Sequence, residues 1–321
     1  MTIVAPEFMA WATLKTDDAT PTTVAFSATG NNFCQLGADG SIWYWSLDEY
    51  GEATWVQLDN NQASIAMITD GDEIYQLHKD GSIWAYVDSP SWELLDSNSA
   101  TIAITAADGQ LFQLHRDGSI WLYVPDSTPS WLQLDNKQAV AVLCTVGHLY
   151  QLLNDGSILE YNGTPFTGWL TLDTNPATVS IAADGESLYQ LHNDGSVWGY
   201  DHSGTPWQKF GDPNDFQTTA IATGPGDFLA QLQLNGDVYA YVGSFDQPDS
   251  AAWTQIGSQL TGGGETFPDA LAFAGGQPQR APFFVSDPVE PVVYGDGSDY
   301  SGLYLLTIDS QIREAGFISA D

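Results

Sequence analysis

The sequence predicts an all-β fold, and three observations lead to this prediction. A segment of about 39 residues recurs along the chain, and most copies hold a short Asp-Gly turn between two apolar stretches. Most copies are followed by a Trp-x-x-Leu phrase. Asp-Gly between alternating apolar residues is a strong β-hairpin signal. No segment shows the periodicity of a helix over a useful length.

The predicted strands follow in the same order in each repeat. Alternating Val, Ile and Ala residues, as in residues 101–106, predict a first strand. Leu-Tyr-Gln-Leu-His predicts the second and Ser-Ile-Trp-x-Tyr the third, with Asp-Gly between them. The Trp-x-x-Leu phrase predicts the fourth. The turn glycine recurs every 37 to 41 residues, as Gly40, Gly81, Gly118, Gly156, Gly195 and Gly236.

The two ends of the chain divide one repeat between them. Trp11-Ala-Thr-Leu14 has no turn phrase before it, and the last turn phrase, around Asp309, has no tryptophan after it. Four strands in about 40 residues match one β-propeller blade. The sequence therefore predicts a single domain over residues 1–321. We expect a seven-bladed β-propeller of four-stranded blades, with the closing blade shared between the N- and C-termini.

The repeat spacing breaks once, in the last repeat. From Gly236 to Ser310 the chain advances 74 residues, about 35 more than one repeat. The extra residues are rich in Gly and Pro and lack both phrases. We predict an insertion near 262–299, between the first and second strands of the last blade. An eighth, eroded blade is the alternative.

Composition excludes several classes of partner. The chain has 41 acidic and 7 basic residues and a net charge of −34, so it cannot neutralise a run of phosphates, and we exclude nucleic-acid binding. No stretch is apolar enough for membrane insertion. The N-terminus lacks the features of a signal peptide, so we expect a cytoplasmic protein, or one exported by an unconventional route. Cys34 and Cys144 are expected to be buried free thiols.

Two phrases resemble the repeats of a known group of lectins. They are Leu-Tyr-Gln-Leu-His-Asn-Asp-Gly-Ser-Val-Trp, at 188–198, and Trp-Leu-Thr-Leu-Asp-Thr-Asn-Pro-Ala-Thr, at 169–178. Both are similar to repeats of fungal and bacterial tectonin-like propellers, which are related in architecture to the tachylectin-2 lectins. The resemblance covers nearly the whole chain. It implies a sugar-binding protein with several equivalent sites, of a kind that often agglutinates foreign glycans in defence.

Polar residues at fixed places in the repeat are the candidate carbohydrate-binding residues. The second-strand amide either ties neighbouring blades together or lines a sugar pocket. The histidine of three repeats is a further polar candidate. The Asp of the turn and the Asp or Asn after the fourth strand would share one face, where such groups bind sugar hydroxyls; a purely structural turn is the alternative. The candidates are Gln76, His78, Asp80, Asp96, Gln113, His115, Asp117, Asp135, Asn136, Gln151, Asp155, Asp173, Gln190, His192 and Asp194.

The recurring tryptophans have two interpretations. They pack between blades, or a ring near a strand end stacks on the apolar face of a sugar. A two-residue Asp-Gly turn would pair Leu77 with Trp84 on one face of the hairpin, and it would leave Gln76 and His78 on the other.

We predict no cofactor, no metal site and no enzyme activity. The three repeat histidines would lie on different blades, too far apart for metal–ligand distances of about 2 Å. His148 and His202 lie outside that repeat position. Short acidic runs at 70–72 and 296–299 lack the spacing of an EF-hand. The chain has no Gly-x-Ser-x-Gly, no phosphate loop and no dinucleotide fingerprint.

These observations lead to two hypotheses about function. The first is a multivalent carbohydrate-binding protein with glycans as partners, because many weak sites on one body gain avidity on a glycan-dense surface. The second is a protein-interaction scaffold that uses the 262–299 insertion as its surface for a protein partner.

Overall fold

The computed structural model describes most of the repeats. The described residues are 7–8, 12–13, 23–29, 32–47, 53–70, 73–88, 91–145, 147–184, 187–204, 206–211, 217–224, 228–235, 237–241, 243, 245, 248, 252–257, 300–306 and 312–318. The predicted insertion near 262–299, the alternative eighth blade and the turn at Asp309 fall outside them. Within the described ranges, no helix is long and apolar enough to cross a membrane.

Six antiparallel sheets follow one another along the chain, and in each one four consecutive strands pair in order. Sheet 1 contains β3 (Thr23–Thr29), β4 (Asn32–Gly37), β5 (Ile42–Leu47) and β6 (Ala53–Asp59). Sheet 2 contains β7 (Ser64–Asp70), β8 (Glu73–His78), β9 (Ile83–Asp88) and β10 (Ser91–Asp96). Sheet 3 contains β11 (Thr101–Ala107), β12 (Gln110–His115), β13 (Ile120–Tyr123) and β14 (Trp131–Asp135).

The next three sheets repeat this plan. Sheet 4 contains β15 (Ala139–Thr145), β16 (His148–Leu153), β17 (Ile158–Tyr161) and β18 (Trp169–Asp173). Sheet 5 contains β19 (Thr178–Asp184), β20 (Ser187–His192), β21 (Val197–Tyr200) and β22 (Gln208–Phe210). Sheet 6 contains β23 (Thr218–Gly224), β24 (Phe228–Gln233), β25 (Val238–Tyr241) and β26 (Trp253–Gly257).

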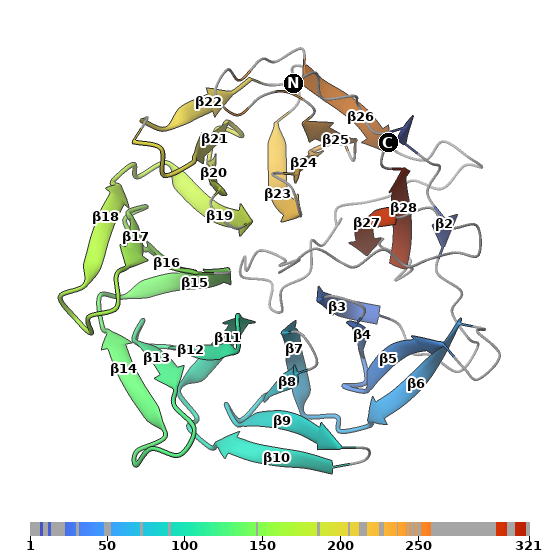
Figure 1. Ribbon diagram of the computed structural model, residues 1–321, viewed down its shortest axis with the longest axis vertical. Coiled ribbons are helices and arrows are strands. Elements are labelled where there is room, and N and C mark those ends of the chain that lie inside the picture. Colours follow the sequence, from blue (N-terminus) through green and yellow to red (C-terminus); the bar gives the residue numbers. More distant parts are fainter. Residues whose placement is uncertain are drawn as a thin grey trace.

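The sheets are arranged around a common centre, as Figure 1 shows. The first strand of each sheet is innermost and the fourth is outermost. First strands of consecutive sheets lie side by side, from β3 and β7 round to β19 and β23. This radial order of four-stranded sheets is the arrangement of a β-propeller.

The two ends of the chain contribute to one further sheet. β27 (Tyr300–Leu306) and β28 (Ile312–Ile318) form a hairpin, and β28 also pairs with β1 (Glu7–Phe8) and β2 (Ala12–Thr13). β2 lies inside the Trp11–Leu14 phrase, and its two residues, Ala12 and Thr13, pair with Glu314 and Arg313 of the C-terminal hairpin. On its other side, β27 lies beside β3 of sheet 1.

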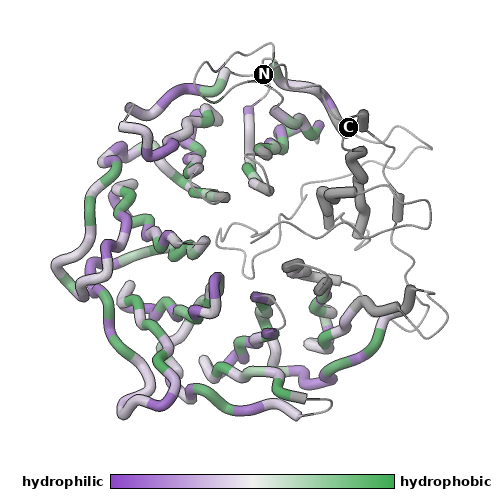
Figure 2. Tube along the Cα trace, viewed as in Figure 1, coloured by the Kyte–Doolittle hydropathy of each residue, from purple (hydrophilic) through white to green (hydrophobic). Residues whose placement is uncertain are grey.

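The hydrophobic core consists of layers between neighbouring sheets. In one layer, Leu114 and Leu134 of sheet 3 pack with Val142 and Trp169 of sheet 4. Equivalent layers join sheets 2 and 3, sheets 4 and 5, and sheets 5 and 6. Figure 2 accordingly shows hydrophobic stretches in each of the six sheets. Cys34 and Cys144 are buried free thiols, as predicted.

The turn between the second and third strands is longer than the two-residue turn that the sequence predicts. In sheet 2 the amide of His78 donates to the carbonyl of Ser82 at 2.9 Å, and the amide of Gly81 donates to the carbonyl of His78 at 2.9 Å. The loop therefore has three residues, 79–81. Only its glycine, with a φ of 87°, adopts a left-handed backbone. This is a type I turn closed by a glycine bulge.

The longer loop shifts the register by one residue and changes which side chains share a face. Gln76 lies opposite Trp84, and Leu77 lies opposite Ile83. The predicted pairing of Leu77 with Trp84 is therefore wrong, and so is the placement of Gln76 on the opposite face from that tryptophan. The same offset occurs in sheets 1, 3, 4, 5 and 6.

Candidate functional site

Two kinds of loop interlock on one face of the sheets. In sheet 2 the amide of Lys79 donates to the carbonyl of Ala63, in the loop before the sheet, at 2.8 Å. On its other side, Gly81 packs against Asn98 and Ser99, in the loop to sheet 3. Both contacts recur in sheets 3 and 5, and one of the two recurs in each of sheets 1, 4 and 6. We call this face the turn belt; it comprises turns 38–40, 79–81, 116–118, 154–156, 193–195 and 234–235 and loops 60–63, 97–100, 136–138, 174–177 and residue 217.

Each turn of sheets 1 to 5 presents an exposed carboxylate that local hydrogen bonds hold in place. Asp80 Oδ1 accepts from the amide of Ser82 at 2.9 Å and from its hydroxyl at 2.7 Å. The hydroxyl of Ser82 accepts from Nε1 of Trp84 at 3.0 Å. Because these bonds favour the charged form, the pKa of Asp80 lies below its ordinary value. Hydrogen bonds from the serine two residues ahead likewise lower the pKa of Asp39, Asp117, Asp155 and Asp194.

The aspartate at the end of the fourth strand in sheets 1 to 4 has a different role, because it bridges two sheets. Asp96 Oδ1 accepts from the amides of Ser97 and Asn98, at 2.7 and 3.2 Å, and so shapes the loop. Its Oδ2 accepts from Nε2 of Gln113 in the next sheet at 2.9 Å. The hydroxyl of Thr101 then donates to Oε1 of that glutamine at 2.5 Å.

This Asp–Gln bridge recurs between neighbouring sheets. It joins Asp59 to Gln76, Asp135 to Gln151, and Asp173 to Gln190, at 2.9, 2.5 and 2.8 Å. All four bridging glutamines are at most 1% exposed. The geometry fits the interpretation in which the amide ties neighbouring blades together. A sugar contact by these glutamines and aspartates stays a prediction.

Sheet 4 lacks one member of the bridge. Ala139 stands where Thr101 stands in sheet 3, and Oε1 of Gln151 has no hydrogen-bond partner. Asn136, which follows Asp135 in the chain, is exposed in a loop of the turn belt. The candidate residues that the structure places on the surface are therefore Asp80, Asn136, Asp117, Asp155 and Asp194.

The repeat histidines are buried against the third-strand tryptophans. The rings of His115 and Trp121 stack with centroids 5.4 Å apart, and His78 and His192 stack in the same way. Burial lowers the pKa of all three histidines. The side-chain amide of Asn98 faces Nε2 of His115 at 3.5 Å, and an amide N–H can only donate, which also favours the neutral ring.

We expect the free energy of unfolding to decrease as the pH is lowered from about 7 to about 5, because the fold holds these three imidazoles neutral. Their folded-state pKa is depressed, so the unfolded chain takes up protons first as the pH falls. Sheet 6 carries Gln233 at this repeat position. Replacing His78, His115 and His192 by Gln is therefore expected to make the free energy of unfolding less dependent on pH in that range. Urea denaturation across this pH range measures the effect. An unchanged pH dependence in the triple variant would contradict the prediction.

The tryptophans in or directly before the fourth strands of sheets 2 to 5 each donate a hydrogen bond to the preceding sheet. Trp131 packs on Tyr123 with centroids 5.1 Å apart, and its Nε1 donates to the carbonyl of Leu95 in sheet 2 at 3.3 Å. Three equivalent bonds run from Trp92 to Leu58, from Trp169 to Leu134 and from Trp207 to Leu172. The accepting leucine belongs to the Trp-x-x-Leu phrase of the preceding repeat, so the packing interpretation is confirmed for these tryptophans.

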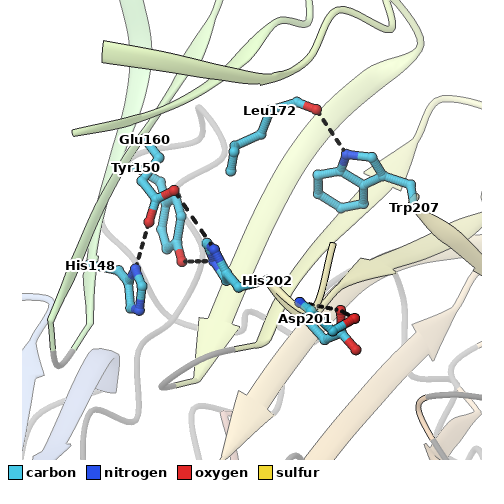
Figure 3. A network of polar contacts seen from close by, with 8 residues as sticks. His148, Tyr150, Glu160, Leu172, Asp201, His202 and Trp207 are labelled. Carbon is cyan, nitrogen blue, oxygen red and sulfur yellow. Dashed lines mark hydrogen bonds and ion pairs between the residues drawn. The ribbon is translucent and has the colours of Figure 1, made fainter. Parts of the chain in front are cut away.

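A second polar group lies between sheets 4 and 5, away from the repeat positions. His148 Nδ1 lies 2.6 Å from Oε1 of Glu160, and His202 Nδ1 lies 3.8 Å from Oε2 of the same carboxylate. The hydroxyl of Tyr150 is 2.9 Å from Nε2 of His202. Figure 3 shows the two imidazoles on either side of Glu160. Sequence reasoning missed this group because His202 belongs to the repeat after the one that holds His148 and Glu160, and nothing in the order of the chain brings the three side chains together.

Comparisons with known proteins identify the fold. No protein-family model and no curated protein matches the chain. Among solved structures, YCF48 bound to D1 peptide has a TM-score of 0.62 at 14% identity, covering 99% of this chain and 98% of that one. Prp20p from Saccharomyces cerevisiae has a TM-score of 0.55 at 13% identity, covering 92% and 82%.

A third structure points to the same fold. Virginiamycin B lyase from Staphylococcus aureus has a TM-score of 0.56 at 12% identity, covering 97% of this chain and 99% of that one. Identities this low speak for the fold alone, and none of the three is a tectonin or a tachylectin-2 lectin. With the repeated four-stranded sheets, these neighbours show that the chain is an all-β repeat protein with a β-propeller fold.

Proposed function

We propose that the protein is a non-enzymatic binding propeller that recognises a basic surface of a protein partner. The observation that carries the proposal is the row of five exposed turn aspartates, one in each of sheets 1 to 5. Their pKa values are lowered by hydrogen bonds, so all five are ionised near neutral pH. Positive side chains of a partner are the complementary ligands for such a row.

The rigidity of the turn belt supports this proposal. The turns of sheets 2, 3 and 5 are each fixed to two loops, and each turn aspartate is fixed to its own serine, so these carboxylates hold their spacing before a partner arrives. Lys79, Arg116 and Lys137 also lie on the belt, so its charge is patterned and not uniform. Patterned charge favours one orientation of a partner over others.

The structural neighbours agree with this class of function. YCF48 is described as bound to D1 peptide, and Prp20p is described with binding properties to Gsp1p and histones. Virginiamycin B lyase is named as an enzyme, so the neighbours support a protein partner without deciding between a binding protein and an enzyme. The insertion near 262–299 is a second candidate surface for that partner.

The experiment uses substitutions that preserve the turn. Asn235 stands at the turn position in sheet 6, and its Oδ1 accepts a hydrogen bond from the amide of Asp237 at 3.0 Å. Asp-to-Asn changes are therefore expected to keep the fold. A variant with Asn at 39, 80, 117, 155 and 194 is compared with the wild type on an array of basic, neutral and acidic peptides at two salt concentrations. We expect salt-dependent binding of basic peptides by the wild type, and a loss of at least about tenfold in the variant.

The control for this experiment changes the opposite charges on the same belt. Replacing Lys79 and Arg116 by Gln removes positive charge and is expected to strengthen the binding of basic peptides. A second variant lacks residues 262–299. Equal binding by the wild type and the five-Asn variant, together with a loss in the deletion variant, would move the partner site to the insertion.

Glycan binding is the second candidate function, and one observation favours it. Exposed carboxylates recur in nearly identical surroundings, which suits several weak, equivalent sugar sites. A glycan array with and without calcium, probed with the wild type and the five-Asn variant, tests it. A family of related sugar hits that the Asn changes abolish would support the lectin hypothesis.

The proposed architecture is a propeller of seven blades. Pairing of β28 with β1 and β2, and the position of β27 beside β3, support a last blade that both termini share. Such a blade would join sheet 6 to sheet 1 and leave no free sheet edge between them.

A further inference from the structure

The group formed by His148, Glu160 and His202 departs from the repeat in a concerted way. At the position of Glu160, sheets 2, 3, 5 and 6 carry small or apolar residues, namely Ala85, Leu122, Gly199 and Ala240, and sheet 1 carries Tyr44. At the position of His148 the other sheets carry Asn32, Glu73, Gln110, Ser187 and Phe228. Among the described residues, no other repeat places two imidazoles around a carboxylate, so the blade fold does not require this group.

The backbone at His202 also points to a specific role. His202 adopts a φ of 58°, the left-handed region that costs a non-glycine residue roughly 1–2 kcal/mol. This conformation, two residues beyond β21, brings the ring within 3.8 Å of the Glu160 carboxylate, which belongs to the preceding sheet. A strained backbone that delivers a ligand-type side chain is typical of functional sites.

The rings are held in place by packing. His148 stacks on Tyr150 with centroids 5.7 Å apart, and on His202 with centroids 4.7 Å apart. Tyr150 is fully buried. The side chains of His148, Glu160 and His202 are each 15–19% exposed, so an ion could enter while the site stays largely shielded from water.

We propose that His148, Glu160 and His202 bind a divalent transition-metal ion of the zinc type, which cross-links sheets 4 and 5. Two imidazoles and one carboxylate are a known zinc ligand set, with distances of about 2.0–2.2 Å and a water in the fourth place. The ligand atoms all lie within 4.8 Å of one another. In a tetrahedral site ligand atoms lie about 3.3 Å apart, so the 2.6 Å contact of His148 with Glu160 must open by about 0.7 Å. The widest separation among the three ligand atoms, at most 4.8 Å, must close by up to about 1.5 Å.

Tyr150 completes the site as a positioning residue. If Nδ1 of His202 binds the metal, the proton of that ring lies on Nε2 and donates to the Tyr150 hydroxyl, 2.9 Å away. A partner on the far nitrogen fixes the tautomer of a metal-binding histidine, and its loss typically weakens metal binding by 10–100-fold. The net charge of the chain, −34, favours a cation throughout.

The test is a zinc titration of the full chain against a chromophoric chelator. We expect one zinc per chain, bound in the presence of excess calcium because calcium prefers oxygen ligands. His202→Gly removes a ligand at a φ that glycine adopts readily, so misfolding does not explain a loss. This variant and Glu160→Gln are expected to bind zinc at least about tenfold more weakly, and Tyr150→Phe about 10–100-fold more weakly.

The matched control is His192→Gln, which removes a repeat histidine and keeps the zinc group. It is expected to bind one zinc as the wild type does. Zinc binding that is unchanged in His202→Gly would overturn the proposal, and so would a wild-type site from which calcium displaces the ion. Because the readout is zinc itself, the result is independent of whether the turn belt binds a protein.

Discussion

Replacing Gly118 by alanine is expected to lower the free energy of unfolding by about 3 kcal/mol. Gly118 has a φ of 80°, which an alanine adopts only at a cost of roughly 1–2 kcal/mol. A Cβ atom there would also lie 2.6 Å from the amide nitrogen of Ala139 and closer still to the backbone of Gln138. The contact is with backbone, so no side chain can turn away, and the turn must separate from the loop to sheet 4.

Gly109→Ala is the matched control. Gly109 also has a left-handed backbone, with a φ of 70°, but a Cβ atom there meets nothing within 4 Å. It is expected to cost about 1 kcal/mol, the conformational part alone. Urea denaturation of both variants separates the two contributions. Equal losses at the two positions would show that the interlocking of the turn belt contributes nothing to stability.

The second large effect is expected at the Asp–Gln bridge. Gln113→Glu places a carboxylate oxygen where Nε2 now donates to Asp96 across 2.9 Å, at a side chain that is only 1% exposed. Two like charges then face each other in a buried site without a donor between them. Breaking a buried charged contact in this way costs roughly 3–5 kcal/mol. The loss is expected to grow as the pH rises and the new carboxyl group ionises.

Asp96→Asn in the same chain is expected to restore at least half of that loss. Asparagine can place its Nδ2 where Asp96 Oδ2 now lies, and donate to the new glutamate, while its Oδ1 still accepts from Ser97 and Asn98. The four proteins form a double-mutant cycle whose coupling energy is read from urea denaturation. If the double variant loses as much stability as the two single variants lose together, Asp96 and Gln113 do not act as a unit.

Much of the fold follows from local patterns that the chain repeats. The Asp-Gly turns, the alternating apolar strands and the Trp-x-x-Leu phrases each determine a short element, and their period predicts four-stranded sheets around one centre. The register could not be read from the same pattern, because Asp-Gly occurs both in two-residue turns and in turns closed by a glycine bulge. Only the hydrogen bonds of His78 with Ser82 and Gly81 distinguish the two.

The candidate sites show the same division. The sequence alone places amides and carboxylates at recurring positions, but their partners belong to the next repeat. Only the packing of sheet on sheet shows that Asp96 and Gln113 bond to each other inside the protein, whereas Asp80 stays at the surface. His148, Glu160 and His202 break the repeat instead of following it. Their proximity depends on how sheets 4 and 5 face each other, because a local pattern fixes a strand and its turn but not which side chains of neighbouring sheets meet.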